Sequence, residues 1–340
     1  MPNTPPFTLT AAMLDLCTRI GEQVGRLSAQ EESALSLRLR RINRIRTVQG
    51  SLAIEGNTLS EEQITAILDG KRVLAPPREI QEAHNALTTY ERLTSWSPYL
   101  VDDLLDAHRC LMTGLLPDAG RFRSGGVGVM SGNQVVHVAP QAGRVYGLMC
   151  DLLGWLKSAD VHPLIASSVF HYEFEFIHPF ADGNGRMGRL WQTLILSHWQ
   201  PMFAYVPVES LVHQHQQGYY AAIRQSTAET DAAPFILFML ERILEAVSSI
   251  SSPQVSHQVT PQVKALLQSL RGEMSREEIM QQLGLSDRKS FSARYLQPAL
   301  KQGLIEMTQP DKPRSRSQRY RLTSTRFHGE AYTDSYRGEV

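Results

Sequence analysis

Two arginines and three glycines within residues 178–189, HPFADGNGRMGR, could bind an anion. Arg186 and Arg189 lie three positions apart and would project from neighbouring faces of one helix. A helix N-terminus carries about half a positive charge, so arginines in a first turn are favourable only when something anionic binds them. Gly183 and Gly185 leave backbone N–H groups open to the same anion. The stretch therefore predicts a deep anion site suited to polyphosphate.

Asp182 and His178 add metal and proton chemistry to this site. An aspartate would repel a bare phosphate, but a magnesium ion between the two groups turns it into a bridge. Histidine titrates near neutral pH, so His178 is suited to act as a general base. Together the residues predict chemistry on a magnesium-bound polyphosphate.

The same stretch also matches the dinucleotide-binding pattern G-x-G-x-x-G at Gly183, Gly185 and Gly188. A strand that precedes this pattern in a parallel sheet should be almost entirely apolar, but Glu173 and Glu175 lie in the preceding segment. No second strand–helix unit surrounds the pattern, and the lysine of a P-loop is absent. We therefore reject a dinucleotide-binding fold.

Both flanks of the motif have helical periodicity. His178 stands before a proline, where the first helix must end. The second helix has one apolar face, formed by Met187, Leu190, Trp191, Leu194 and Ile195. The sequence therefore predicts two helices joined by a short turn that carries the reactive residues.

These twelve residues match in full the signature H-x-F-x-[D/E]-G-N-G-R-x-x-R, and the chain resembles the Fic family over roughly residues 40–245. The resemblance implies a helical bundle with a β-hairpin flap. It also implies magnesium-dependent transfer of AMP from ATP, with release of pyrophosphate, to Ser, Thr or Tyr hydroxyls of proteins, including the enzyme itself. Some relatives transfer UMP, phosphocholine or phosphate instead, and nothing in the sequence fixes the nucleobase.

The resemblance assigns a role to each residue of the motif. His178 would deprotonate the attacking hydroxyl, Asp182 would hold magnesium on the α- and β-phosphates, and Phe180 would pack inward to fix the loop. Tyr219 and Tyr220 would lie near the adenine, although two aromatic residues on a helix are as often core. The positions implied to bind the phosphates are Gly183, Asn184, Gly185, Arg186 and Arg189.

Residues 51–57, SLAIEGN, contain a second charge in an unfavourable place. Gly56 and the asparagine after it indicate a helix end, so Glu55 lies at the negative end of the helix dipole. The segment resembles the inhibitory motif [S/T]-x-x-x-E-[G/N] of the family, with Ser51 and Glu55 at its marked positions. The resemblance implies that Glu55 pairs with Arg189, so that the γ-phosphate is not properly seated and the enzyme is autoinhibited. In some relatives the same glutamate supports removal of AMP, which the sequence leaves open.

A hairpin is predicted where two β-branched runs flank SGNQ within residues 124–138. By resemblance it is the flap of the family. We expect a protein target to dock on residues 127–138 by strand addition. The alternative is an ordinary surface hairpin.

The expected fold is mainly α: a Fic-type helical bundle with a hairpin flap, followed by an α+β winged helix-turn-helix. Residues 247–262 are rich in Ser, Pro and Gln and indicate a linker. The expected domains are an N-terminal helical region with the inhibitory motif at 1–100, the Fic catalytic core at 101–246, the linker at 247–262, the winged helix at 263–325 and a tail at 326–340.

The winged helix suggests a function of another class. Basic residues lie on its expected recognition helix and wing, as in phosphate contact with DNA. DNA-binding regulation and protein docking, including homodimer contacts, are equally open. The basic residues are Arg288, Lys289, Arg294, Lys312, Arg314, Arg316, Arg319 and Arg321.

The composition limits the remaining classes. The 34 basic and 34 acidic residues balance, so no net field favours nucleic acid or membrane. The three cysteines form no CxxC pair, which argues against a zinc site or a disulfide framework. We find neither a signal peptide nor an apolar run long enough to span a membrane. A cytoplasmic protein without a membrane partner is expected.

Overall fold

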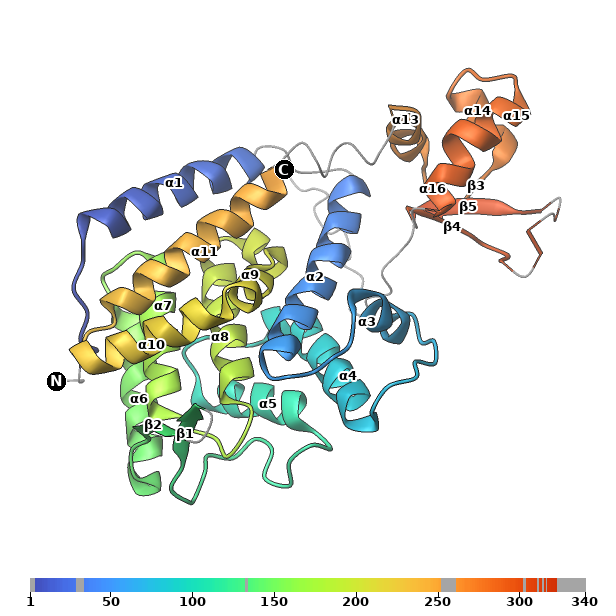
Figure 1. The fold of residues 1–340 in the computed structure, drawn as a ribbon. Helices are drawn as coiled ribbons and strands as arrows, with labels where there is room; N and C mark the ends of the chain where they lie inside the picture. Colours follow the sequence, from blue (N-terminus) through green and yellow to red (C-terminus); the bar gives the residue numbers. More distant parts are fainter. Residues whose placement is uncertain are drawn as a thin grey trace, which may run out of the picture. The chain divides into compact units, whose positions relative to one another are not determined.

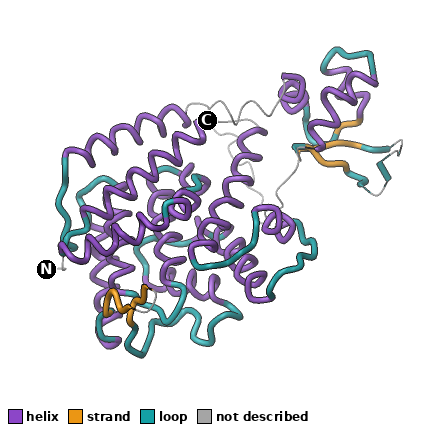
Figure 2. The backbone as a smooth tube through the Cα atoms, viewed as in Figure 1, coloured by secondary structure: helices purple, strands orange, loops and turns teal. Residues whose placement is uncertain are grey.

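The computed structural model describes residues 4–28, 34–131, 134–251, 261–301, 304–310, 312, 313, 315 and 317–322. Contacts divide the chain into two compact units, residues 1–31 with 39–252 and residues 32–38 with 253–340. Helices dominate the first unit, and strands occur in one hairpin there and in the second unit (Figure 2). The expected mainly α fold is confirmed.

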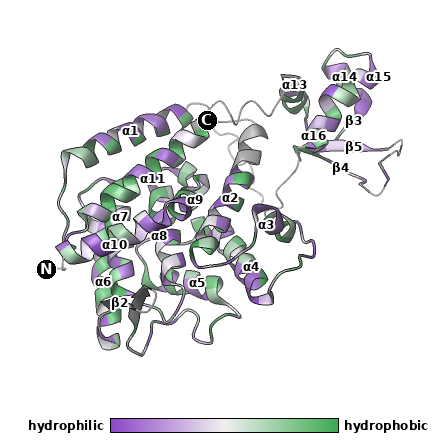
Figure 3. Cartoon of the chain, viewed as in Figure 1, coloured by the Kyte–Doolittle hydropathy of each residue, from purple (hydrophilic) through white to green (hydrophobic). Residues whose placement is uncertain are grey.

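The helices that build the first unit are α1 (Ala11–Ser28), α2 (Ala34–Ile54), α3 (Glu61–Leu68), α4 (Pro77–Glu91), α5 (Val101–Met112), α6 (Ala142–Ser158), α7 (Pro163–Ile177), α8 (Asn184–Trp199), α9 (Val208–Gln214), α10 (Gln216–Glu229) and α11 (Ala233–Ser251), with short 3₁₀ turns at Leu93–Ser95 and Pro201–Tyr205. Helices α7 and α8 pack against each other at the centre, α11 packs on α7, and α1 lies along α11 (Figure 1). Hydrophobic and hydrophilic residues alternate along α1 and α11, as expected for amphipathic helices (Figure 3).

The central pair positions the motif. Most side chains of α7 and α8 are buried, including Phe170, Phe174 and Trp191. A Cβ atom on Gly188 would lie 2.7 Å from Glu175 Oε1 and 2.8 Å from His171 Cδ2. Gly188, the third glycine of the motif, therefore allows α7 and α8 to pack closely against each other.

The predicted hairpin is present as β1 (Gly128–Ser131) and β2 (Gln134–Val138), which pair antiparallel with a register shift between Val129 and Met130. Residues 132 and 133 of its expected turn lie outside the described residues. Helix α11 extends to Ser251, into the segment expected to be a linker, and residues 252–260 lie outside the described part.

The second unit contains α13 (Pro261–Ser269), α14 (Arg276–Gln282), α15 (Arg288–Phe291) and α16 (Gln297–Lys301), with a π-helical segment at Ser292–Leu296 joining the last two. Strands β4 (Ile305–Met307) and β5 (Arg319–Leu322) form the expected hairpin. A short strand that was not predicted, β3 (Met274–Ser275), pairs with β5, so the sheet order is β3-β5-β4. Helices followed by this hairpin give the order expected of a winged helix-turn-helix. The tail at 326–340 lies outside the described residues.

Close backbone packing fixes the end of α2. A Cβ atom on Gly50 would lie 2.7 Å from both the Cα and the N of Ser210 in α9. Ser210 Oγ also donates a hydrogen bond of 2.8 Å to the carbonyl of Arg46. Because the obstacle is backbone, it cannot turn aside as a side chain could, and the C-terminal part of α2 is held against α9.

We expect Gly50→Ala to lower the free energy of unfolding by about 1–3 kcal/mol, the usual cost of overpacking. Thermal unfolding followed by circular dichroism measures this. Gly21→Ala in α1 is the matched control, because a Cβ atom there meets nothing within 4 Å. It should be neutral or stabilising, since alanine is favoured over glycine in helices. Equal midpoints for the two variants would contradict the packing argument.

Candidate active site

The motif forms the turn between α7 and α8. His178 ends α7 in the left-handed conformation, with φ 50° and ψ 62°, and its N–H donates to the Phe174 carbonyl at 2.9 Å. A residue other than glycine held there costs about 1–3 kcal/mol, so the surroundings must determine it. Gly183 is also left-handed, with φ 83°, and begins α8 as its N-cap. The predicted end of the first helix at His178 is confirmed.

Arg123, which the sequence analysis did not single out, holds His178 through its backbone. Its Nε donates to the His178 carbonyl at 2.7 Å, and Nη2 donates to the carbonyls of Pro140 at 2.5 Å and Ile177 at 3.3 Å. Nη1 donates to the Gly125 carbonyl at 2.8 Å. Arg123 is 6% exposed. One buried guanidinium therefore ties both ends of the hairpin segment to the peptide of the histidine.

His108 and Phe180 pack against each other and hold the loop. Gly120 N–H donates to His108 Nδ1 at 2.9 Å, so Nε2 carries the proton and donates to the Asp182 carbonyl at 3.0 Å. Burial lowers the pKa of His108 to about 4, which keeps the ring neutral. The Phe180 ring is fully buried and stacks on His108 with centroids 3.6 Å apart. The inward packing expected of Phe180 is present.

The Asn184 side chain bonds with both backbone groups of Phe180. Its Oδ1 accepts from the Phe180 N–H at 2.8 Å, and its Nδ2 donates to the Phe180 carbonyl at 2.9 Å. The side chain is therefore used to close the loop and is not free for a phosphate. Only the backbone of Asn184 can contribute to an anion site.

The N-terminus of α8 is the most electropositive backbone feature of the loop. The first N–H groups of a helix have no partner within it, and Gly183 has no side chain to cap them. A Cβ atom on Gly185 would lie 2.5 Å from Glu55 Oε1. The Glu55 carboxylate therefore lies over the first turn of α8, where an anion was expected.

Glu55 forms an ion pair with Arg189, as the resemblance implied. Arg189 Nη2 donates to Glu55 Oε1 at 2.7 Å and to the Ser51 carbonyl at 3.1 Å, and Arg189 Nε donates to Ser51 Oγ at 3.3 Å. The Arg189 side chain is 2% exposed and the Glu55 side chain 36%. Burial lowers the pKa of Arg189, but the charge and hydrogen bond of Glu55, together with Tyr219 and Glu175, outweigh burial and raise that pKa overall. Both marked residues of the inhibitory motif thus contact one buried arginine.

Arg186 forms ion pairs of its own, separate from the Glu55–Arg189 pair. Its Nη2 is 3.4 Å from Asp182 Oδ1, and its Nη1 is 3.6 Å from Glu82 Oε1 of α4. Arg78 of the same helix is 3.5 Å from Asp182 Oδ2. Helix α4 therefore adds Arg78 and Glu82 to the site, and in the sequence nothing distinguishes them from other charged residues on a helix.

Asp182 is the residue best suited to a metal ion. Its side chain is 44% exposed, and within the described residues no group of three or more His, Cys, Asp or Glu side chains could hold a metal ion alone. Magnesium is usually bound by one or two carboxylates together with substrate phosphates and water. A single accessible aspartate beside an anion site fits that ion.

The two tyrosines of α10 differ in their exposure. Tyr219 is 2% exposed, and its hydroxyl lies 3.1 Å from His171 Nε2, so it belongs to the core. Tyr220 is 40% exposed, and its pKa is raised by burial and by the charge of Glu55. Of the pair expected near the adenine, Tyr220 alone is open to solvent on the side of the Glu55–Arg189 pair.

Carboxylates contact several basic residues of the second unit. Arg321 lies 2.6 Å from Glu306 and 2.8 Å from Glu273. Arg319 lies 3.5 Å from Glu278, and Arg288 lies 3.2 Å from Glu277. Three residues expected to contact DNA therefore have acidic neighbours, which reduces the local positive charge. Arg314 and Arg316 lie outside the described residues.

Comparison with known proteins agrees with these observations. Residues 98–196 match the model of the Fic/DOC family, and residues 261–323 match the model described as Filamentation induced by cAMP protein Fic-like, C-terminal domain. Fic-1 of Caenorhabditis elegans has a solved structure that is 25% identical, with a TM-score of 0.61, 72% of this chain covered and 74% of that chain. In the described residues no helix is long and apolar enough to cross a membrane.

The protein adenylyltransferase Fic of Nematostella vectensis is 33% identical over 211 residues, which cover 58% of this chain and 47% of the relative. That of Aedes aegypti is 30% identical over 255 residues, covering 69% of this chain and 49% of the relative. The chain thus spans about half the length of these curated relatives.

The solved structure of a Fic family protein from Desulfovibrio desulfuricans is 53% identical to this chain. The match covers 97% of this chain and 100% of that chain, with a TM-score of 0.72. Because this likeness runs through both units and the complete motif lies in the turn between two buried helices, the chain belongs to the Fic family.

Proposed function

We propose that this protein transfers AMP from ATP to Ser, Thr or Tyr hydroxyls of a protein, itself included, and that Glu55 restrains the reaction. The observation that carries the proposal is the position of the Glu55 carboxylate, which contacts Arg189 at 2.7 Å and lies over the first turn of α8. A carboxylate held there marks the spot as an anion site. The names of the curated relatives, protein adenylyltransferase, support ATP as the nucleotide.

His178 is the proposed base. Its Nδ1 is buried and has no hydrogen-bond partner among the described residues, while its backbone is fixed by Arg123. The imidazole would take the proton of the attacking hydroxyl as its oxygen bonds to the α-phosphorus. The bond from that phosphorus to the bridging oxygen would break, and pyrophosphate would leave. Such a reaction needs mainly positioning and charge neutralisation.

The phosphates would lie between the backbone amides at 183–185 and the two arginines. Arg189 is suited to the terminal phosphate once Glu55 has moved, and Arg186 lies beside Asp182. Asp182 would hold magnesium, which neutralises phosphate charge when bound. The hairpin β1–β2, anchored by Arg123 at Gly125 and Pro140, would present an edge to an extended target segment.

Replacing Glu55 with glycine should free Arg189 and the first turn of α8 for the nucleotide. We expect Glu55→Gly to increase incorporation of α-labelled ATP into protein by about tenfold or more, because the terminal phosphate gains a hydrogen bond to a charged group. Gel autoradiography with magnesium present measures this. Glu91→Gly is the matched control, since Glu91 also stands at a helix end and is exposed. Equal labelling of both variants and the wild type would exclude the restraint, and preference for labelled UTP or CTP would exclude AMP.

His178→Ala in the Glu55→Gly background should lower labelling by about 10²-fold or more, the usual effect of losing a general base. Nucleotide binding should be retained, because Arg123 holds the backbone of residue 178 and makes no contact with the imidazole. Intact-mass spectrometry counts the adenylyl groups added. His198→Ala, at an exposed position near the end of α8, serves as control. Unchanged labelling after loss of His178 would refute the base assignment.

A further inference from the structure

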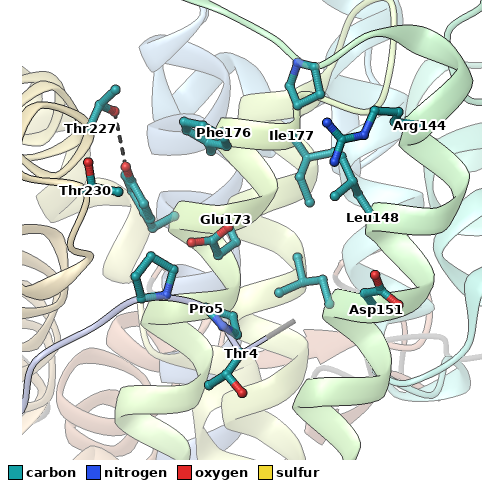
Figure 4. A pocket seen from close by; sticks show the side chains of 14 residues that line it. Thr4, Pro5, Arg144, Leu148, Asp151, Glu173, Phe176, Ile177, Thr227 and Thr230 are labelled. Atoms are coloured by element: carbon teal, nitrogen blue, oxygen red, sulfur yellow. Dashed lines mark hydrogen bonds between the residues drawn. The ribbon is translucent and has the colours of Figure 1, made fainter. Parts of the chain in front are cut away.

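A pocket of about 410 Å³ lies away from the motif, between the N-terminal segment Thr4–Pro6 and helices α6, α7 and α10 (Figure 4). Its size falls within the range of small-molecule sites, about 300–1,000 Å³. The N-terminal wall is anchored. The Pro6 carbonyl accepts from the Ala232 N–H at 2.9 Å, and Thr8 Oγ1 donates to Asp231 Oδ2 at 2.5 Å. Hydrogen bonds therefore hold the N-terminal wall of the pocket in place.

Glu173 is the charged group inside this pocket. Figure 4 shows Glu173 on α7, above Pro5 and among the residues that line the pocket. In the described part of the chain, no hydrogen bond or ion pair joins this carboxylate to another residue. Burial alone raises the pKa of Glu173 to about 7, and no neighbouring charge contributes. A half-buried carboxyl group without a partner is unfavourable in an empty pocket.

The remaining lining is mainly apolar and aromatic, with three threonines and two charged residues, Arg144 and Asp151. Tyr172 OH is engaged with Thr227 Oγ1 at 3.2 Å, and burial raises its pKa, so the phenol stays neutral. Arg144 and Asp151 are exposed on the rim, two turns apart on α6, and their opposite charges balance. Glu173 therefore decides the charge of the interior. The apolar and aromatic lining consists of Pro5, Pro6, Pro140, Leu148, Leu152, Tyr172, Phe176 and Ile177.

We propose that this pocket binds an organic cation, a primary ammonium on a short hydrocarbon stem, with the ammonium at Glu173. The ammonium would donate to the carboxylate, and the stem would pack on Leu148 and Leu152. Aromatic faces attract such cations further. An anion would be repelled by the Glu173 carboxylate, and a neutral molecule would leave its negative charge without a counter-charge. A free amine and a lysine side chain of another protein share this chemistry.

Isothermal titration of the full chain with n-hexylammonium tests the site. Hexan-1-ol and heptanoate have the same six-carbon stem without the cation and should bind at least about tenfold more weakly, the effect of one charge-assisted hydrogen bond. Glu173→Gln should cause a similar loss, whereas Asp151→Asn on the rim should change affinity little. Equal binding of hexan-1-ol, or unchanged binding by Glu173→Gln, would overturn the proposal.

A titration with a lysine derivative distinguishes a free amine from a lysine side chain of another protein. Nα-acetyl-lysine N-methylamide carries the lysine side chain without terminal charges. Binding at least as tight as that of hexylammonium assigns the site to a lysine of a partner protein, and weaker binding assigns it to a free amine.

Proton release provides an independent readout. A bound cation favours the ionised carboxylate, so binding near pH 7 should release protons from Glu173, whose pKa is about 7 in the free pocket. The other charged or titratable groups that line the pocket are Arg144, Asp151 and Tyr172. Binding heats measured in two buffers of different ionisation enthalpy should differ for the wild type and agree for Glu173→Gln. Wild-type heats independent of buffer would refute the role of Glu173.

Discussion

The positive first turn of α8 is the constraint on which the rest of the site depends. Its N–H groups point into the loop without a capping side chain, and Arg189 adds a full charge that is almost entirely buried. Such a concentration of positive charge requires an anion. In this structure Glu55 supplies that anion from the end of α2. A carboxylate and a phosphate meet the same electrostatic requirement, so in the proposed function the Glu55 carboxylate and the terminal phosphate would compete for one position.

Packing contacts and hydrogen bonds hold in place both the end of α2, which carries Glu55, and the loop before α8. Helix α2 is pressed against α9 at Gly50, so Ser51 and Glu55 enter from a fixed direction. On the other side, Arg123, His108 and Asn184 fix the loop through backbone atoms. These contacts offset the cost of the left-handed His178. Among the described residues, His178 Nδ1 is left without a hydrogen-bond partner, as a preorganised base requires.

The sequence alone was sufficient for the local features of the site. The helix end at His178 follows from Pro179, and the unfavourable charges of Glu55 and Arg189 indicated that each needed a partner. The residues it missed act over long separations. Arg123 and His108 serve backbone carbonyls about 55 to 74 positions away, and no periodicity marks such contacts.

Two further limits have physical causes. Strand β3 has two residues and exists only because β5 pairs with it, so its pattern was too short to detect. Helix α11 continued past its expected end because a serine-rich composition does not by itself stop a helix.

The central claim is that Glu55 occupies the place of the terminal phosphate. Calorimetric titration of ATP and ADP, each with magnesium, into the wild type and Glu55→Gln tests it most directly. We predict that the wild type binds ATP no more tightly than ADP. In the variant ATP should gain about tenfold over ADP, because its last phosphate then reaches Arg189. The same ratio of ATP to ADP affinity in both proteins would contradict the account.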